Sequence, residues 1–126
     1  MQGPHAVRVA IDGPDAAGKS VLADELAAAF RERPRAVVRR SIDDFLRPQA
    51  DRHVFVSVGF EEILRRAVLR DAHRFGSAEE VERRYRTRYI PGQRLYLAAT
   101  RPELVADAVV YNDDPSRPLL RVRTPS

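Results

Sequence analysis

Hydrophobic and polar positions along this chain of 126 residues divide it into short apolar runs and longer amphipathic segments. The short runs are rich in β-branched residues and predict strands at residues 7–12, 36–42, 54–58 and 106–111. The amphipathic segments repeat apolar residues at helical spacing and predict helices at residues 21–30, 60–75, 78–90 and 93–100. This alternation indicates one α/β domain over residues 1–126, with a parallel sheet and helices on both faces.

Local signals refine these boundaries. The run at 7–12 is nearly continuous in apolar character, which is typical of a parallel strand buried on both faces. Ser77 and Glu80 have the spacing of a capping box, so we expect a helix to begin after Ser77. We expect Pro91 and Gly92 to kink or interrupt that helix, and the tail beyond Ser116 to be frayed.

A glycine loop joins the first predicted strand to the first predicted helix. Its sequence has the form G-x-x-x-x-G-K-S, which in this context is typical of a loop that binds phosphate groups. Glycine at both ends lets backbone N–H groups turn toward phosphate oxygens at the positive end of the helix. An ordinary glycine-containing turn is the alternative. The glycine loop consists of Gly13, Pro14, Asp15, Ala16, Ala17, Gly18, Lys19 and Ser20.

Lys19 strengthens this interpretation. The chain has 22 basic residues, and Lys19 is its only lysine. A compact ammonium group fits among the N–H groups of such a loop, whereas a planar guanidinium is too bulky. We therefore expect Lys19 to reach the β- and γ-phosphates, and the Ser20 hydroxyl to bind Mg²⁺.

Composition excludes several classes of protein. The chain has no cysteine, so it has neither disulfides nor thiolate metal sites. It contains no apolar run long enough to span a bilayer and no signal-peptide pattern, so we expect a cytoplasmic protein without a membrane partner. The net charge of +4 suits a basic cleft for a triphosphate. A nucleic-acid-binding module is the weaker alternative, because the arginines are interleaved with 18 acidic residues.

Two carboxylates follow the predicted strand at 36–42. Ligands of open α/β sheets bind at the carboxyl ends of the strands, so Asp43 and Asp44 are placed to face the phosphates of the glycine loop. The alternative is that either residue caps the next turn.

Three arginines lie four residues apart on the predicted helix at 60–75. Arg66, Arg70 and Arg74 would repel one another unless anions lie along them, and Asp71 alone does not neutralise all three. They form either a solvated face or a row of cations that closes over transferring phosphates.

These parts together indicate phosphoryl transfer. Lys19 and the loop amides would hold ATP, and Ser20 would bind Mg²⁺. Asp43 would accept the proton of an attacking hydroxyl and help to hold the metal. Arg66 and Arg70 would neutralise the transferred phosphoryl group.

Five stretches of the chain follow the pattern of a known family: residues 11–20, 41–45, 66–71, 82–93 and 106–110. In these stretches the chain resembles uridine kinases and their close relatives of bacterial type. The resemblance implies the fold of a P-loop NTPase, ATP or GTP as donor, Mg²⁺, and a pyrimidine nucleoside phosphorylated at its 5′-hydroxyl. It also implies that Asp43 is the catalytic aspartate and that Arg66 and Arg70 belong to a basic helical lid over residues 60–98.

The chain is shorter than the proteins it resembles. Between Arg52 and Val54 such kinases have several tens more residues, which supply a nucleoside pocket and an apolar strand ending in a Walker-B acid. We therefore expect a sheet without that Walker-B strand. Two hypotheses follow: an active nucleoside kinase, or a catalytically impaired remnant that still binds nucleotide. The acceptor and the oligomeric state stay open, although a second copy could complete the sheet.

Overall fold

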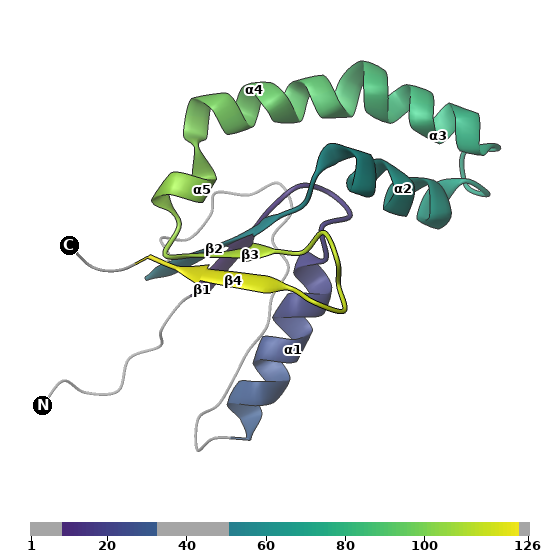
Figure 1. The fold of residues 1–126 in the computed structure, drawn as a ribbon. Coiled ribbons are helices and arrows are strands. Elements are labelled where there is room, and N and C mark those ends of the chain that lie inside the picture. The colour runs from purple at the N-terminus through teal and green to yellow at the C-terminus, as the bar shows by residue number, and fades with distance from the viewer. Residues whose placement is uncertain (1–8, 33–50, 124–126) are drawn as a thin grey trace, which may run out of the picture.

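A computed structural model of the protein describes residues 9–32 and 51–123. It is an α/β structure with an open sheet of four strands in the order β1-β2-β3-β4 (Figure 1). Strands β1, β2 and β3 are parallel, and β4 runs antiparallel to β3. The strands are β1 (Val9–Asp12), β2 (Arg52–Ser57), β3 (Ala108–Tyr111) and β4 (Leu119–Val122). The predicted strand at 36–42, with Asp43 and Asp44, lies outside the described residues.

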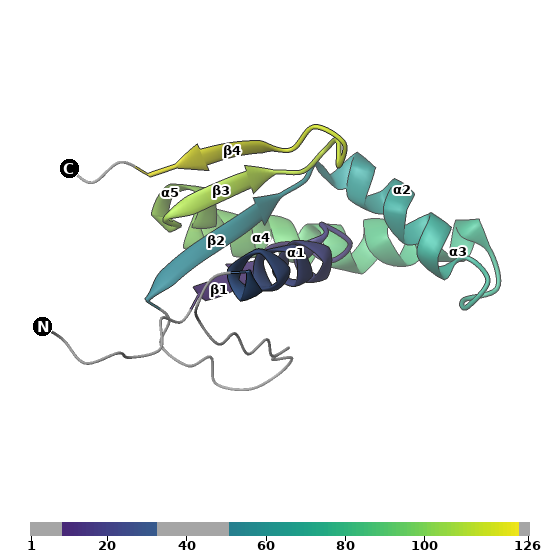
Figure 2. The same ribbon diagram turned by 90° about the horizontal axis from the view of Figure 1, so that it is seen from below.

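Helices lie on both sides of the sheet (Figure 1; Figure 2). Helix α1 descends from one side, and α3, α4 and α5 lie on the other, while α2 extends from the carboxyl end of β2. The helices are α1 (Lys19–Arg31), α2 (Phe60–Asp71), α3 (Ala78–Arg84), the π-helix η1 (Tyr85–Tyr89), α4 (Ile90–Thr100) and α5 (Pro102–Val105).

The main core packs the apolar stripe of α2 against β2 and the following helices. Ile63, Leu64 and Ala67 are buried, as the helical spacing of the apolar residues predicted, and Phe60 of the same stripe is partly buried against them. They share one cluster with Val56 of β2 and with Tyr85 of η1. A second cluster surrounds Phe55, Ala106 and Val109. Because neighbouring residues Phe55 and Val56 belong to different clusters, β2 is buried along both of its side-chain rows.

The helical arm from α3 to α4 begins as predicted but continues differently. The Ser77 side chain accepts a hydrogen bond of 3.1 Å from the Glu80 N–H, which confirms the cap. Pro91 does not interrupt the arm; it occupies the first turn of α4. The irregularity lies earlier, in the wide turn of η1, where the Ile90 N–H bonds to the Tyr85 carbonyl. A single π-turn of this kind re-aims the side chains that follow it.

Three expectations about the sheet were wrong. The tail beyond Ser116 is not frayed throughout, because Leu119–Val122 pairs with β3. The sheet is consequently not all parallel. No residue of β1 is fully buried, and Val9 is exposed, so β1 is not the doubly buried strand that its composition indicated. None of the helices in the described ranges is long and apolar enough to cross a membrane.

Candidate functional site

The glycine loop lies where β1 ends and α1 begins, at the carboxyl end of the parallel strands (Figure 1). The two glycines are required there for different reasons. A Cβ at Gly13 would lie 2.6 Å from the Val56 carbonyl oxygen, so the loop packs directly on β2. Gly18 has a φ of +96°, and a Cβ there would lie 2.7 Å from the Asn112 amide nitrogen. The loop is therefore a tight turn closed by β2 and by the end of β3.

Lys19 folds back over the loop. Its Nζ donates a hydrogen bond of 2.6 Å to the Gly13 carbonyl, which joins the two ends of the loop. Ser20 is exposed in the first turn of α1. Within the described ranges, the N–H groups of Gly18, Lys19 and Ser20 have no hydrogen-bond acceptor, as is usual for the first turn of a helix. The end of the loop and the first turn of α1 thus supply one ammonium and three N–H donors.

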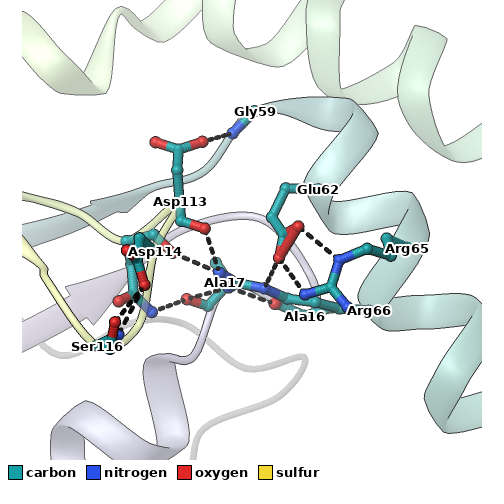
Figure 3. Close-up of polar contacts among 10 residues, drawn as sticks. Ala16, Ala17, Gly59, Glu62, Arg65, Arg66, Asp113, Asp114 and Ser116 are labelled. Carbon is teal, nitrogen blue, oxygen red and sulfur yellow. Dashed lines mark hydrogen bonds and ion pairs between the residues drawn. The ribbon is translucent and has the colours of Figure 1, made fainter.

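Arg66 of α2 attaches to the outside of the loop. Its Nε pairs with the Glu62 carboxylate at 2.9 Å. Its Nη1 lies 3.3 Å from the Ala16 carbonyl oxygen and 3.4 Å from that of Ala17 (Figure 3). Only 15% of the Arg66 side chain is exposed, so this residue does not belong to a solvated face.

The turn after β3 holds both the loop and the start of α2. The Asn112 side chain donates a hydrogen bond of 2.9 Å to the Ala17 carbonyl, and the Asn112 and Asp113 carbonyls accept from Arg66 Nη2. The Asp113 carboxylate accepts a hydrogen bond of 2.8 Å from the Gly59 N–H, directly before α2 (Figure 3). Sequence reasoning missed Asn112, although its position after a parallel strand was the same signal that singled out Asp43.

Asp15 links the loop to the helices above it. Its carboxylate accepts hydrogen bonds from Arg70 at 3.0 Å and from the Tyr85 hydroxyl at 2.6 Å. Its backbone N–H donates to the Tyr89 hydroxyl oxygen. The two tyrosine rings contact each other, with centroids 4.9 Å apart. Tyr85 and Tyr89, at the two ends of η1, therefore both bind one residue of the loop.

The ionisation of this network follows from its contacts. Burial acts to raise the pKa of Asp15, but hydrogen bonds from Arg70 and Tyr85 outweigh it and lower that pKa below its ordinary value of 3.8. Burial, together with the neighbouring Asp15, raises the pKa of the Tyr85 hydroxyl. The hydrogen bond from Arg70 lowers the pKa of Asp71. At neutral pH two carboxylates consequently face the single Arg70 cation.

The structure brings Lys19, Arg66 and Arg70 to the glycine loop but leaves Arg74 apart. The guanidinium of Arg74 lies over the Phe75 ring, 5.5 Å from its centroid. Arg66 and Arg70 do not need an external anion, because Glu62 pairs with Arg66, and Asp15 and Asp71 pair with Arg70. Asp43, the predicted base, lies outside the described residues.

The loop fits a polyphosphate by its donors, since it supplies the Lys19 ammonium and three N–H groups without an acceptor among the described residues. For Mg²⁺ it supplies the Ser20 hydroxyl, and the part of the chain described here contains no group of three or more His, Cys, Asp or Glu residues able to hold a metal. The chain matches no protein-family model, no curated protein and no solved structure.

Proposed function

We propose that this protein binds a nucleoside triphosphate at the glycine loop and transfers its terminal phosphoryl group to the hydroxyl of a small molecule. The observation that carries the proposal is the Lys19 ammonium, held 2.6 Å from the Gly13 carbonyl across a loop whose other donors are N–H groups. In phosphate-binding loops of this form, the lysine and the backbone N–H groups contact the β- and γ-phosphates. The resemblance to uridine kinases favours a pyrimidine nucleoside as acceptor.

In this proposal the residues have distinct parts. The amides of Gly18 and Lys19 and the Lys19 ammonium bind the phosphates, and Ser20 holds Mg²⁺, which neutralises phosphate charge when bound. The acceptor oxygen forms a bond to the γ-phosphorus, the bond to the bridging oxygen breaks, and the nucleoside diphosphate leaves. The resemblance assigns the proton of the acceptor hydroxyl to Asp43.

A second candidate is a protein that binds the triphosphate without transferring its phosphoryl group. The contacts of the two lid arginines favour it. Arg66 is already bound to Glu62 and to loop carbonyls, and Arg70 is already paired with two carboxylates. Neither cation is therefore free to neutralise a phosphoryl group in this conformation.

The first prediction tests binding through Lys19. We expect Mg·ATP at a hundredfold excess over its Kd to stabilise the wild-type protein by about 2.7 kcal/mol, measured as a rise in Tm. Lys19→Ala removes the ammonium, so we expect it to abolish most of this rise. Arg31→Ala is the control, because Arg31 is an exposed cation in the last turn of the same helix and should leave the rise intact.

Release of ADP then distinguishes the two candidates. Release that requires added uridine or cytidine supports the kinase, whereas a Tm rise without such release supports the protein that only binds nucleotide. A wild-type Tm that Mg·ATP does not change would contradict both.

A further inference from the structure

All three nitrogens of the Arg66 guanidinium group lie within hydrogen-bond distance of an acceptor. Its Nε donates to Glu62 at 2.9 Å, and its Nη1 lies within 3.4 Å of the Ala16 and Ala17 carbonyl oxygens. Its Nη2 donates to the Asn112 carbonyl, with the Asp113 carbonyl oxygen 3.3 Å away. Each of the three nitrogens is therefore engaged, and four of the five acceptors are backbone carbonyls.

Two separate segments of backbone meet at this guanidinium. One is the middle of the glycine loop, and the other is the turn that follows β3, far away in the sequence (Figure 3). Asn112 adds a second connection between them, because its side-chain amide donates to the Ala17 carbonyl at 2.9 Å. The Ala17 carbonyl oxygen thus accepts from both Arg66 and Asn112.

The direction of these carbonyls determines the direction of the loop's N–H groups. In a planar trans peptide the C=O and the N–H point in opposite directions. Drawing the Ala17 carbonyl outward toward Arg66 and Asn112 turns the Gly18 N–H away from them. The same reasoning applies to the Ala16 carbonyl and the Ala17 N–H, which points across the loop to the Pro14 carbonyl at 3.3 Å.

We propose that Arg66 and Asn112 form a loop brace: they are positioning residues that orient the Ala17 and Gly18 peptides of the glycine loop, and Arg66 does not act by neutralising a transferred phosphoryl group. The brace specifies how the proposed nucleotide-binding loop is held in shape, and the identity of the loop's ligand rests on the proposed function. To reach a phosphate, Arg66 would have to leave several carbonyls at a site where its side chain is only 15% exposed.

Arg65 provides a matched control for Arg66. It neighbours Arg66 on α2 and pairs with the same carboxylate, Glu62, at 2.7 Å. Its side chain is 60% exposed, and its described hydrogen bonds all go to Glu62. Replacing either arginine by lysine keeps the charge and removes the planar set of donors. Only the change at Arg66 affects the brace.

The second prediction concerns the loop brace, and amide hydrogen exchange tests it first in the absence of nucleotide. We expect Arg66→Lys to accelerate exchange at least tenfold at the hydrogen-bonded amides of the segment 13–22, such as those of Ala17 and Leu22. Arg65→Lys should leave exchange in this segment unchanged. Asn112→Ala should accelerate exchange in the same segment while Arg66 is intact, and this variant decides the matter if Arg66→Lys does not fold. Unchanged protection in a folded Arg66→Lys protein, or in Asn112→Ala when Arg66→Lys does not fold, would overturn the brace.

Binding of Mg·ATP supplies the second measurement. We expect Arg66→Lys to weaken the affinity at least tenfold and Arg65→Lys to change it less than twofold. Full affinity and protection combined with a loss of turnover in Arg66→Lys would instead make Arg66 a charge-neutralising group and overturn the proposal. If the wild-type protein does not bind Mg·ATP, the proposed function fails, and the exchange comparison still decides whether the brace exists.

Discussion

The two halves of the glycine loop, residues 13–15 and residues 16–20, are attached to the rest of the molecule by different kinds of contact. The first half is held mainly through the Asp15 carboxylate, which binds Arg70 and the Tyr85 hydroxyl, and the Asp15 N–H adds one bond to the Tyr89 hydroxyl. The second half is held through its backbone, because Arg66 and Asn112 bind carbonyl oxygens. The carboxylate contacts of the first half depend on the identity and ionisation of Asp15. The carbonyl contacts of the second half do not depend on which side chains the loop residues carry.

This difference separates two properties of the loop. The backbone contacts fix the shape of residues 16–18, whatever small side chains stand there. The Asp15 contacts instead fix the position of the loop relative to η1 and to the carboxyl half of α2, and they use charges that a bound polyphosphate could compete for. We therefore expect changes at residues 16–18 to destroy the shape of the loop, and changes at Asp15 to loosen the connection of the loop to the helical arm.

The largest effect is expected in the second half, from Gly18→Ala. Alanine is strained by about 1–2 kcal/mol at a positive φ, and its Cβ would lie 2.7 Å from the Asn112 amide nitrogen. Gly76 offers a matched control, because its φ of +94° is close to the +96° of Gly18 and nothing lies within 4 Å of an added Cβ. We expect Gly18→Ala to lower the free energy of unfolding by about 2–4 kcal/mol and Gly76→Ala by about 1–2 kcal/mol, measured by urea denaturation.

The difference between these two variants measures the contact between the loop and Asn112. If both variants lower the free energy of unfolding equally, Asn112 moves aside at no cost. The second half of the loop would then be attached less firmly than its hydrogen bonds indicate. If Gly18→Ala lowers the free energy of unfolding and Gly76→Ala leaves it nearly unchanged, the backbone strain is small at both glycines. The whole effect at Gly18 is then the steric contact of the added Cβ.

Several elements could be predicted from the sequence because their signals are local. The capping box places Ser77 within three residues of the N–H that it binds, and the stripe from Ile63 to Ala67 spans little more than one helical turn. The glycine loop is likewise contained in eight consecutive residues. In each case one short segment carries the whole pattern.

What could not be predicted depends on partners distant in the sequence. All four residues of β4 are exposed, so no periodicity distinguished Leu119–Val122 from a frayed tail; only pairing with β3 makes it a strand. The brace was missed for a related reason. Every residue has a carbonyl, so the sequence does not mark which carbonyls Arg66 binds. Its charge was visible, and charge alone favoured a role at the phosphates.

A smaller effect is expected in the first half, from Asp15→Asn. The ion pair with Arg70 is about half exposed, so water screens it. Most of the loss should come from the hydrogen bond that the buried Tyr85 donates, because the neutral Asn oxygen is a weaker acceptor than the carboxylate. We expect the free energy of unfolding at pH 7 to fall by about 1 kcal/mol, measured by urea denaturation.

The pH dependence of this loss identifies its origin. The pKa of Asp15 is lowered in the folded protein, so its ionised form stabilises the fold above its ordinary pKa of 3.8, and this contribution disappears as the pH falls through the lowered pKa. The difference in stability between wild type and Asp15→Asn should therefore be constant from pH 8 to about pH 5 and shrink below 3.8. A difference that grows on acidification would show that Asp15 is not stabilised as a carboxylate.

The smallest effect is expected from Arg74→Ala, which lies outside both attachments. Arg74 continues the row of Arg66 and Arg70 in the sequence, yet it is exposed and its guanidinium contacts only the Phe75 ring among the partners described, at 5.5 Å. Arg84 covers the same ring at 4.5 Å, so Phe75 keeps a cation when Arg74 is removed. We expect the free energy of unfolding to fall by about 0.5 kcal/mol or less, and the affinity for Mg·ATP to stay within twofold of wild type. A tenfold loss of affinity for Mg·ATP would mean that the end of α2 moves over the bound nucleotide. Arg66, Arg70 and Arg74 would then act together in a conformation that differs from the one described here.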